Sequence, residues 1–151
     1  MSDTKPRIVP PLYFLAAVGA MLLLHKFAPL AYWLGPPWRY VGVVPLLCGL
    51  LLTRSSGMRF RKAGTPLRPG EQAKVFVTEG AFRHTRNPMY LGMMVILIGL
   101  AILLGSVSPL FVMPVLYLIL RYQFIWREEK WMESWFGESY VAYKSKTRRW
   151  I

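Results

Sequence analysis

The chain has 151 residues, the length of one domain, and 54% of them are hydrophobic. Its formal net charge is +12, its mean hydropathy is +0.33 and its pI is near 10.3. Apolar runs separated by basic segments argue against a soluble globule, and basic residues that are spread along the chain argue against a nucleic-acid-binding protein. We therefore predict an all-α integral membrane protein that forms a single domain over residues 1–151.

Four apolar runs predict four transmembrane helices, at about 12–33, 38–53, 89–104 and 109–126. The second and third runs are short for a hydrocarbon core of about 30 Å, which takes about 20 helical residues to cross. The first run follows Lys5 and Arg7, as a signal peptide would. It lacks a good small-residue cleavage signature, and its apolar character resumes at Leu30, so we interpret it as a retained helix.

The distribution of lysine and arginine predicts the orientation in the membrane. Of the 19 basic residues, eight lie in the segment 54–86 and seven in 121–149, whereas the turn 105–108 has none. The positive-inside rule places the leader, the loop 54–88 and the tail 127–151 in the cytoplasm, as an even number of spans requires. We expect a multi-pass protein of a bacterial inner membrane whose site faces the cytoplasm.

The last two spans are joined by a four-residue turn with Gly105 and Pro109 at its edges. Such a short connection predicts an antiparallel helical hairpin. Its two helices have similar lengths, so the chain returns to the depth at which the hairpin began. The segments that flank the hairpin should therefore meet at one mouth.

Both flanking segments are polar. The first runs from Thr78 to Gly92 as TEGAFRHTRNPMYLG, and the second contains the acidic pair Glu128-Glu129. Ionisable side chains at a membrane boundary are expensive to keep, so we take them as candidate site residues. The alternative for the arginines is topology or lipid-headgroup contact, and for the acidic pair it is a helix-surface charge paired with nearby bases. The single cysteine, Cys48, provides neither a disulfide nor a cysteine metal site, and we expect no metal.

Four strings in this order give the chain a family resemblance: GTPLRPG at 64–70, VTEGAFRHTRNPMYLG at 77–92, EEKWMESWFGESYVAY at 128–143 and the terminal RRWI. They resemble the isoprenylcysteine carboxyl methyltransferase and phospholipid methyltransferase superfamily of integral membrane enzymes. The likeness covers roughly the C-terminal 60% of the chain. Many relatives carry histidine before the motif proline, where this chain has the neutral amide of Asn87.

The resemblance implies a pocket for S-adenosylmethionine at the cytoplasmic mouth of the C-terminal hairpin. It implies methyl transfer to a lipophilic or membrane-delivered acceptor, with the bilayer as a partner and no nucleic acid. The residues expected to act in the transfer are Arg86, Asn87 and Glu129. Those expected to bind the cofactor are Arg83, His84, Asn87, Pro88, Tyr90, Leu91, Gly92, Glu128, Glu129, Tyr140 and Tyr143.

These residue types suit that cofactor. Carboxylates can pair with its ammonium group or accept from its ribose hydroxyls, a cation can hold its carboxylate, and tyrosines can contact a positive charge. His84 and Glu129 are the candidates for a general base, which a hydroxyl or amine acceptor would need. Two other functions stay open: an NADPH-dependent membrane reductase related to sterol reductases, and a non-enzymatic membrane subunit with the same fold.

Overall fold

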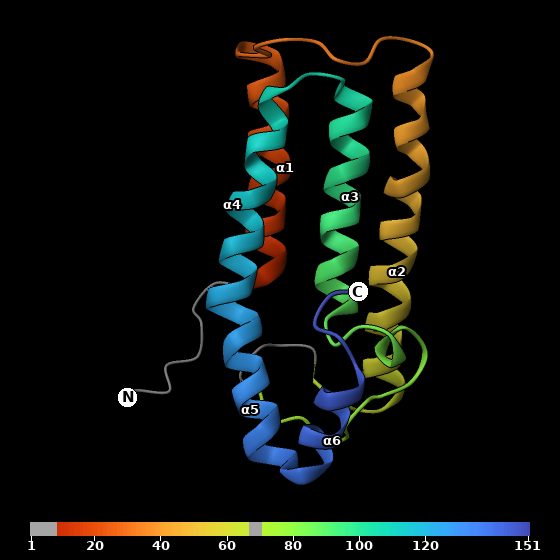
Figure 1. The fold of residues 1–151 in the computed structure, drawn as a ribbon, viewed down its shortest axis with the longest axis vertical. Helices are drawn as coiled ribbons and strands as arrows, with labels where there is room; N and C mark the ends of the chain where they lie inside the picture. Colours follow the sequence, from red (N-terminus) through yellow and green to blue (C-terminus); the bar gives the residue numbers. More distant parts are fainter. Residues whose placement is uncertain (1–8, 67–70) are drawn as a thin grey trace.

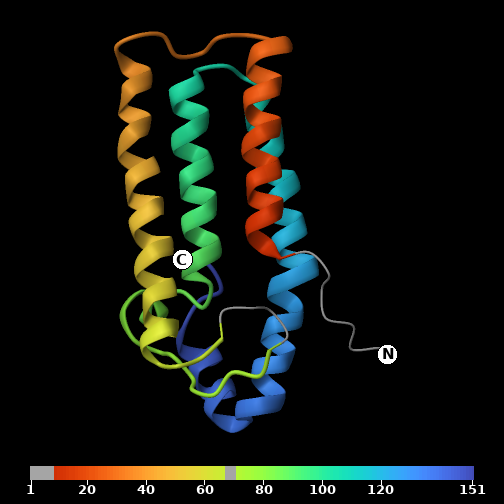
Figure 2. The same cartoon turned by 180° about the vertical axis from the view of Figure 1, so that it is seen from behind.

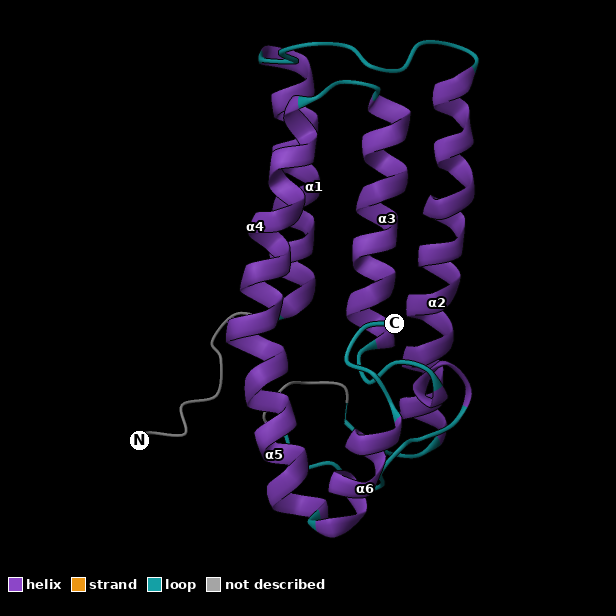
Figure 3. Cartoon of the chain, viewed as in Figure 1, coloured by secondary structure: helices purple, strands orange, loops and turns teal. Residues whose placement is uncertain are grey.

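The computed structural model describes residues 9–66 and 71–151, which form helices and loops and contain no β-strand (Figure 1, Figure 3). Lys5, Arg7 and part of the string at 64–70 lie outside the described residues. The helices are α1 (Pro10–Phe27), α2 (Val43–Lys62), α3 (Pro88–Leu104), α4 (Val112–Ile119), α5 (Trp126–Phe136) and α6 (Glu138–Lys146). Shorter helical turns are η1 (Trp38–Gly42), η2 (Gly80–Arg83), η3 (Ser108–Phe111) and the π-helical turn η4 (Leu120–Ile125). The predicted all-α class is confirmed.

The lengths of the helices fit a multi-pass membrane protein. Among the described residues, three helical segments are long and apolar enough to span a bilayer, namely Pro10–Phe27, Trp38–Lys62 and Ser108–Phe136, and α3 is a shorter apolar helix. The last of these segments joins η3, α4, η4 and α5 into one rod of 29 residues. At 1.5 Å per residue the rod is about 43 Å long, which exceeds a hydrocarbon core of about 30 Å. This rod is therefore longer than the apolar layer is thick.

The core lies between α1, α3 and the rod, and α2 packs on the other side of α3 (Figure 1, Figure 2). Met21, Leu97 and Leu120 are completely buried in this core. Glycines let α2 approach α3 closely: a Cβ added at Gly99 would lie 2.5 Å from the backbone nitrogen of Leu46. Backbone meets backbone along this contact, as is common where transmembrane helices pack through small residues.

The predicted hairpin is present, and α3 and α4 run antiparallel (Figure 1). Gly105 ends α3 with a φ of +68°, and its N–H donates to the carbonyl of Ala101 at 3.0 Å. Glycine adopts this left-handed conformation without strain. The loop after α1 packs on the same turn, where the N–H of Trp33 donates to the carbonyl of Gly105 at 2.9 Å, and His25 Nδ1 in the last turn of α1 lies 2.7 Å from Ser106 Oγ. The two short connections therefore lie together at one end of the bundle, and the polar segments lie at the other.

Three helices end elsewhere than the predicted spans. The first was expected to reach 33, but it ends at Phe27, because a residue before proline disfavours the helical conformation and Ala28 precedes Pro29. The second continues beyond 53 to Lys62, because charged residues end an apolar run without ending a helix. The last continues past 126 to Phe136. Helical residues thus occupy part of the expected loop 54–88 and of the expected tail 127–151.

Candidate functional site

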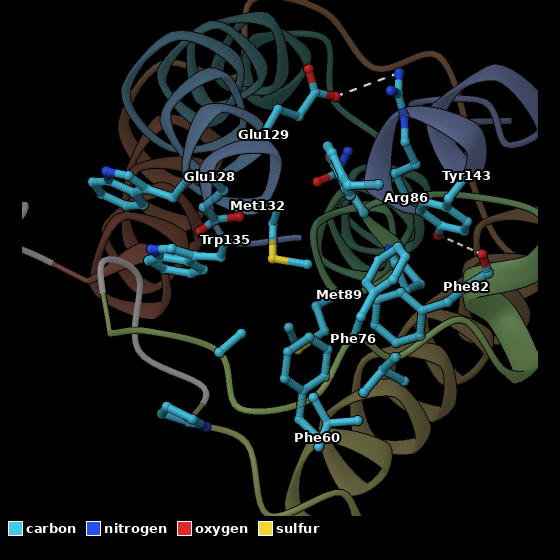
Figure 4. Close-up of a pocket in the computed structure, with 18 of the residues that line it drawn as sticks. Phe60, Phe76, Phe82, Arg86, Met89, Glu128, Glu129, Met132, Trp135 and Tyr143 are labelled. Carbon is cyan, nitrogen blue, oxygen red and sulfur yellow. Dashed lines mark hydrogen bonds and ion pairs between the residues drawn. The ribbon is translucent and has the colours of Figure 1, made fainter. Parts of the chain in front are cut away.

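A pocket lies at the end of the bundle where α3 begins (Figure 4). Glu128 and Trp135 border it from α5, while Arg86 and Tyr143 border it from the opposite side. The end of α2 and the segment 71–77 complete the lining. The pocket therefore joins the two polar segments that flank the hairpin in the sequence.

Most of the predicted site residues line this pocket, namely Arg86, Asn87, Pro88, Tyr90, Glu128, Glu129, Tyr140 and Tyr143. Arg83, His84, Leu91 and Gly92 lie outside its lining. Arg83 and His84 are exposed at the end of η2. Gly92 faces α2, since a Cβ there would lie 2.8 Å from the carbonyl oxygen of Gly49. Gly92, expected to bind the cofactor, is thus approached by a neighbouring helix.

A hydrogen bond between Tyr90 and Glu128 joins the two helices across the pocket. Pro88 occupies the first turn of α3, where a missing N–H has little effect, and the N–H of Leu91 donates to the carbonyl of Asn87 at 2.9 Å. The helix that begins here directs the buried side chain of Tyr90 toward α5, where its hydroxyl donates to Glu128 Oε1 at 2.5 Å. Residues 38 positions apart in the sequence are thereby in direct contact.

Glu129 is buried, with 6% of its surface exposed, and two arginines surround its carboxylate. Arg149 donates from Nε to Oε1 at 2.9 Å and from Nη2 to Oε2 at 2.7 Å. Arg86 Nη2 lies 3.5 Å from Oε1. A bidentate arginine satisfies both oxygens of a carboxylate that burial has removed from water. Sequence reasoning did not single out Arg149, because it resembles the other basic residues of a membrane-surface tail. The signal that could have found it is the string RRWI, which contains Arg149 and belongs to the family resemblance.

Arg86 has unused hydrogen-bonding capacity. Only 10% of its side chain is exposed, and within the described part of the chain its Nε and Nη1 atoms have no hydrogen-bond partner. Buried N–H donors normally have an acceptor. Since Arg86 lines the pocket, it offers a positive charge and free donors to an anionic group there.

Two tyrosines of α6, Tyr140 and Tyr143, line the polar part of the pocket. Burial raises the pKa of Tyr140 well above its ordinary value, and burial raises the pKa of Tyr143 to about 12. Both phenols therefore stay protonated at neutral pH. The hydroxyl of Tyr143 donates to the carbonyl of Phe82 at 2.6 Å, which attaches α6 to the segment before α3.

The remaining lining is apolar and aromatic. Phe76 stacks on Phe136, with ring centroids 5.4 Å apart, and meets the ring of Tyr143 edge-on at 5.0 Å. These contacts hold the segment 71–77 against α5 and α6. Trp131 and Trp135 are stacked on α5 and line the pocket. The pocket thus has a charged part beside α3 and an aromatic part between α5 and the segment 71–77.

Apolar helices and a core shared by α1, α3 and the rod define a multi-pass α-helical membrane protein, and a pocket with polar and aromatic lining lies at one end of its bundle. The sequence model of one family matches residues 38–139 of the chain, and that family is described as phospholipid methyltransferase. The chain belongs to the phospholipid methyltransferase family.

Two further proteins are similar in sequence to part of the chain. The protein-S-isoprenylcysteine O-methyltransferase of Schizosaccharomyces pombe is 33% identical over 76 residues, which are 48% of this chain and 30% of that protein. An uncharacterized protein of Haemophilus influenzae is 39% identical over 64 residues, which are 42% of this chain and 100% of that protein.

The fold is similar to the solved structure of the eukaryotic intramembrane Ras methyltransferase, isoprenylcysteine carboxyl methyltransferase. The TM-score is 0.66 at 18% sequence identity, over 91% of this chain and 50% of that one. The chain thus spans half of this solved structure and less than a third of the fission yeast relative. The likeness to the solved structure concerns the fold.

Proposed function

We propose that this protein is an S-adenosylmethionine-dependent methyltransferase whose acceptor is a lipophilic molecule delivered from the bilayer. Membership of the phospholipid methyltransferase family supports methyl transfer. The observation that carries the proposal is the pocket itself, which combines an arginine with free donors, carboxylates and aromatic rings in one place. We also propose that residues 1–151 act as one membrane domain.

The charged part of the pocket suits the amino-acid end of the cofactor. Arg86 can bind its carboxylate through Nε and Nη1, the two donors without a partner in the described chain. Glu128 can accept from its ammonium or ribose hydroxyls while Tyr90 holds the same carboxylate in place. Tyr140, Tyr143 and Phe76 provide ring faces for the nucleoside and for a positive charge.

The acceptor that suits this site is one that is already deprotonated. S-adenosylmethionine supplies an electrophilic methyl group on a sulfonium, so an anionic acceptor such as a carboxylate needs no general base. Of the two expected bases, His84 is exposed outside the pocket lining and Glu129 is paired with two arginines. The protein then acts by holding both reactants in line and out of water. Arg86 and Asn87 provide the polar contacts for this positioning.

The aromatic part of the pocket suits an apolar acceptor. Trp131, Met132 and Trp135 line it from α5. A lipid-like chain can lie against these side chains while its reactive end faces Arg86. We propose that this end of the bundle faces the cytoplasm of a bacterial inner membrane, because the described basic segments 54–66, 71–86 and 121–149 lie there.

Calorimetry in detergent tests the proposal. The purified protein should bind S-adenosylmethionine and its product S-adenosylhomocysteine, and should not bind NADPH. Replacing Arg86 by alanine should weaken both by about tenfold or more, as expected for lost charge-assisted hydrogen bonds. Arg83→Ala is the matched control, because Arg83 is exposed outside the pocket lining, and it should leave affinity unchanged. Binding of NADPH alone would indicate a reductase, and binding of none of the three would indicate a non-enzymatic subunit.

A further inference from the structure

The last residues of the chain form a strap against the start of α3. We call residues 147–151, which follow α6, the C-terminal strap. The N–H of Arg86 donates to the carbonyl of Arg148 at 2.9 Å. The carbonyl of Arg149 accepts from Thr85 Oγ1 at 3.2 Å and from Asn87 Nδ2 at 3.0 Å. The strap therefore binds the motif residues 85–87 mainly through its own backbone.

An aromatic contact fixes the strap on its other side. Trp150 packs on Tyr117 of α4, with ring centroids 5.3 Å apart, and joins the edge of the hydrophobic core. Arg149 thus extends from a backbone that is held by both α3 and α4. Its guanidinium reaches Glu129 from this fixed position and binds both carboxylate oxygens.

Glu129 lies between two arginines that compete for it. Arg149 holds both oxygens at 2.9 Å or less, whereas Arg86 reaches one of them only at 3.5 Å. A buried carboxylate without a partner is strongly unfavourable, so Glu129 released from Arg149 would turn to Arg86. A bidentate pair between Glu129 and Arg86 would use donors of Arg86 that have no partner in the described chain and would neutralise its positive charge.

We propose that Arg149 is a positioning residue, which keeps Glu129 occupied so that the guanidinium of Arg86 stays free to bind the carboxylate of an S-adenosyl ligand. This inference rests on the proposed function. It distinguishes Arg149 from a residue that only stabilises the fold, since its loss should affect the ligand's amino-acid end and spare the nucleoside.

Two probe ligands separate these effects. S-adenosylhomocysteine has both the nucleoside and the amino-acid carboxylate, and 5′-methylthioadenosine keeps the nucleoside but lacks the amino acid. Their affinities are measured by calorimetry for the full chain in detergent. Arg149→Ala should weaken S-adenosylhomocysteine by about tenfold or more and 5′-methylthioadenosine by less than about twofold. In the background of Glu129→Gln, which removes the competing charge, Arg149→Ala should have a much smaller effect on S-adenosylhomocysteine.

Controls come from the same strap. Arg148→Ala removes an identical charge from an exposed neighbour and should leave both affinities unchanged. Arg149→Lys keeps the charge but not the bidentate geometry, so it should show the same selective loss in a milder form and serves if the alanine variant does not fold. Equal losses for both ligands, unchanged affinity for S-adenosylhomocysteine, or misfolding of both Arg149 variants would overturn the positioning role. A wild-type protein that binds neither ligand would instead overturn the proposed function.

Discussion

Deleting one oxygen atom tests whether the two polar segments form a single site. Tyr90→Phe keeps the aromatic ring and removes the hydroxyl that donates to Glu128 at 2.5 Å. Tyr90 is only 6% exposed, so water replaces this donor poorly. A hydrogen bond contributes about 0.5–1.5 kcal/mol, and we therefore expect the free energy of unfolding to fall by about 1 kcal/mol.

The measurement is reversible unfolding in mixed micelles, with a matched control. Tyr13→Phe removes another interhelical hydroxyl, which donates to Gln123 at 3.2 Å in an exposed position, and should change stability by less than about 0.5 kcal/mol. A double-mutant cycle of Tyr90→Phe with Glu128→Gln should give a coupling energy of about 1 kcal/mol or more, because the two side chains share one bond. Equal effects of the two tyrosine variants, or strict additivity in the cycle, would refute the reasoning.

Three further outcomes follow from the fold. Gly99→Ala should lower the free energy of unfolding by about 1–3 kcal/mol, because the new methyl group meets the backbone of α2. Gly57→Ala, whose new methyl group would have no atom within 4 Å, should be neutral or stabilising. Thermal unfolding compares the two variants, and equal stability would contradict the close helix contact. Cysteines introduced at Gly35 and Ser145 should react with an impermeant thiol reagent from opposite sides of the membrane, the one at Ser145 from the cytoplasm. If both reacted from the same side, the chain could not cross the membrane an odd number of times between them. Burial raises the pKa of Tyr143 from 10.0 to about 12, so the protonated phenol contributes its full stability below pH 10 and loses it as the pH rises toward 12. In alkaline unfolding titrations, the free energy of unfolding of Tyr143→Phe should therefore decline less than that of the wild type.

The sequence predicted those features that depend on the length of apolar runs and on short connections. The turn around Gly105 forces α3 and α4 side by side, and this alone brings Tyr90 to the acidic pair. The contact of Arg149 with Glu129 was not predictable in this way, because it depends on where α6 returns the chain. Gly92 was predicted to bind the cofactor, and it packs against α2 for a related reason. A glycine in the sequence indicates a close approach, but it does not indicate whether a ligand or a helix approaches.

The first helix shows a different limit of sequence reasoning. Hydropathy predicted that the first span would reach residue 33, because hydropathy measures whether a segment is apolar and not whether it is helical. Pro29 ended the helix at Phe27, and the apolar residues that follow cover the hairpin turn. The segment 71–77 is the converse case. Phe76 gave no signal in the sequence, yet it packs on the rings of α5 and α6 beside the pocket.

The unequal lengths of α3 and the rod couple the pocket to the thickness of the bilayer. α3 has 17 residues and is about 26 Å long, shorter than a typical hydrocarbon core, whereas the rod is about 43 Å long. A short helix draws the lipid surface inward around its end, so the headgroup layer should dip toward Pro88 while Trp135 stands outside it. The protein would then hold its pocket in a local depression of the membrane. Thin bilayers should relax this mismatch, and thick ones should increase it at the place where the pocket opens.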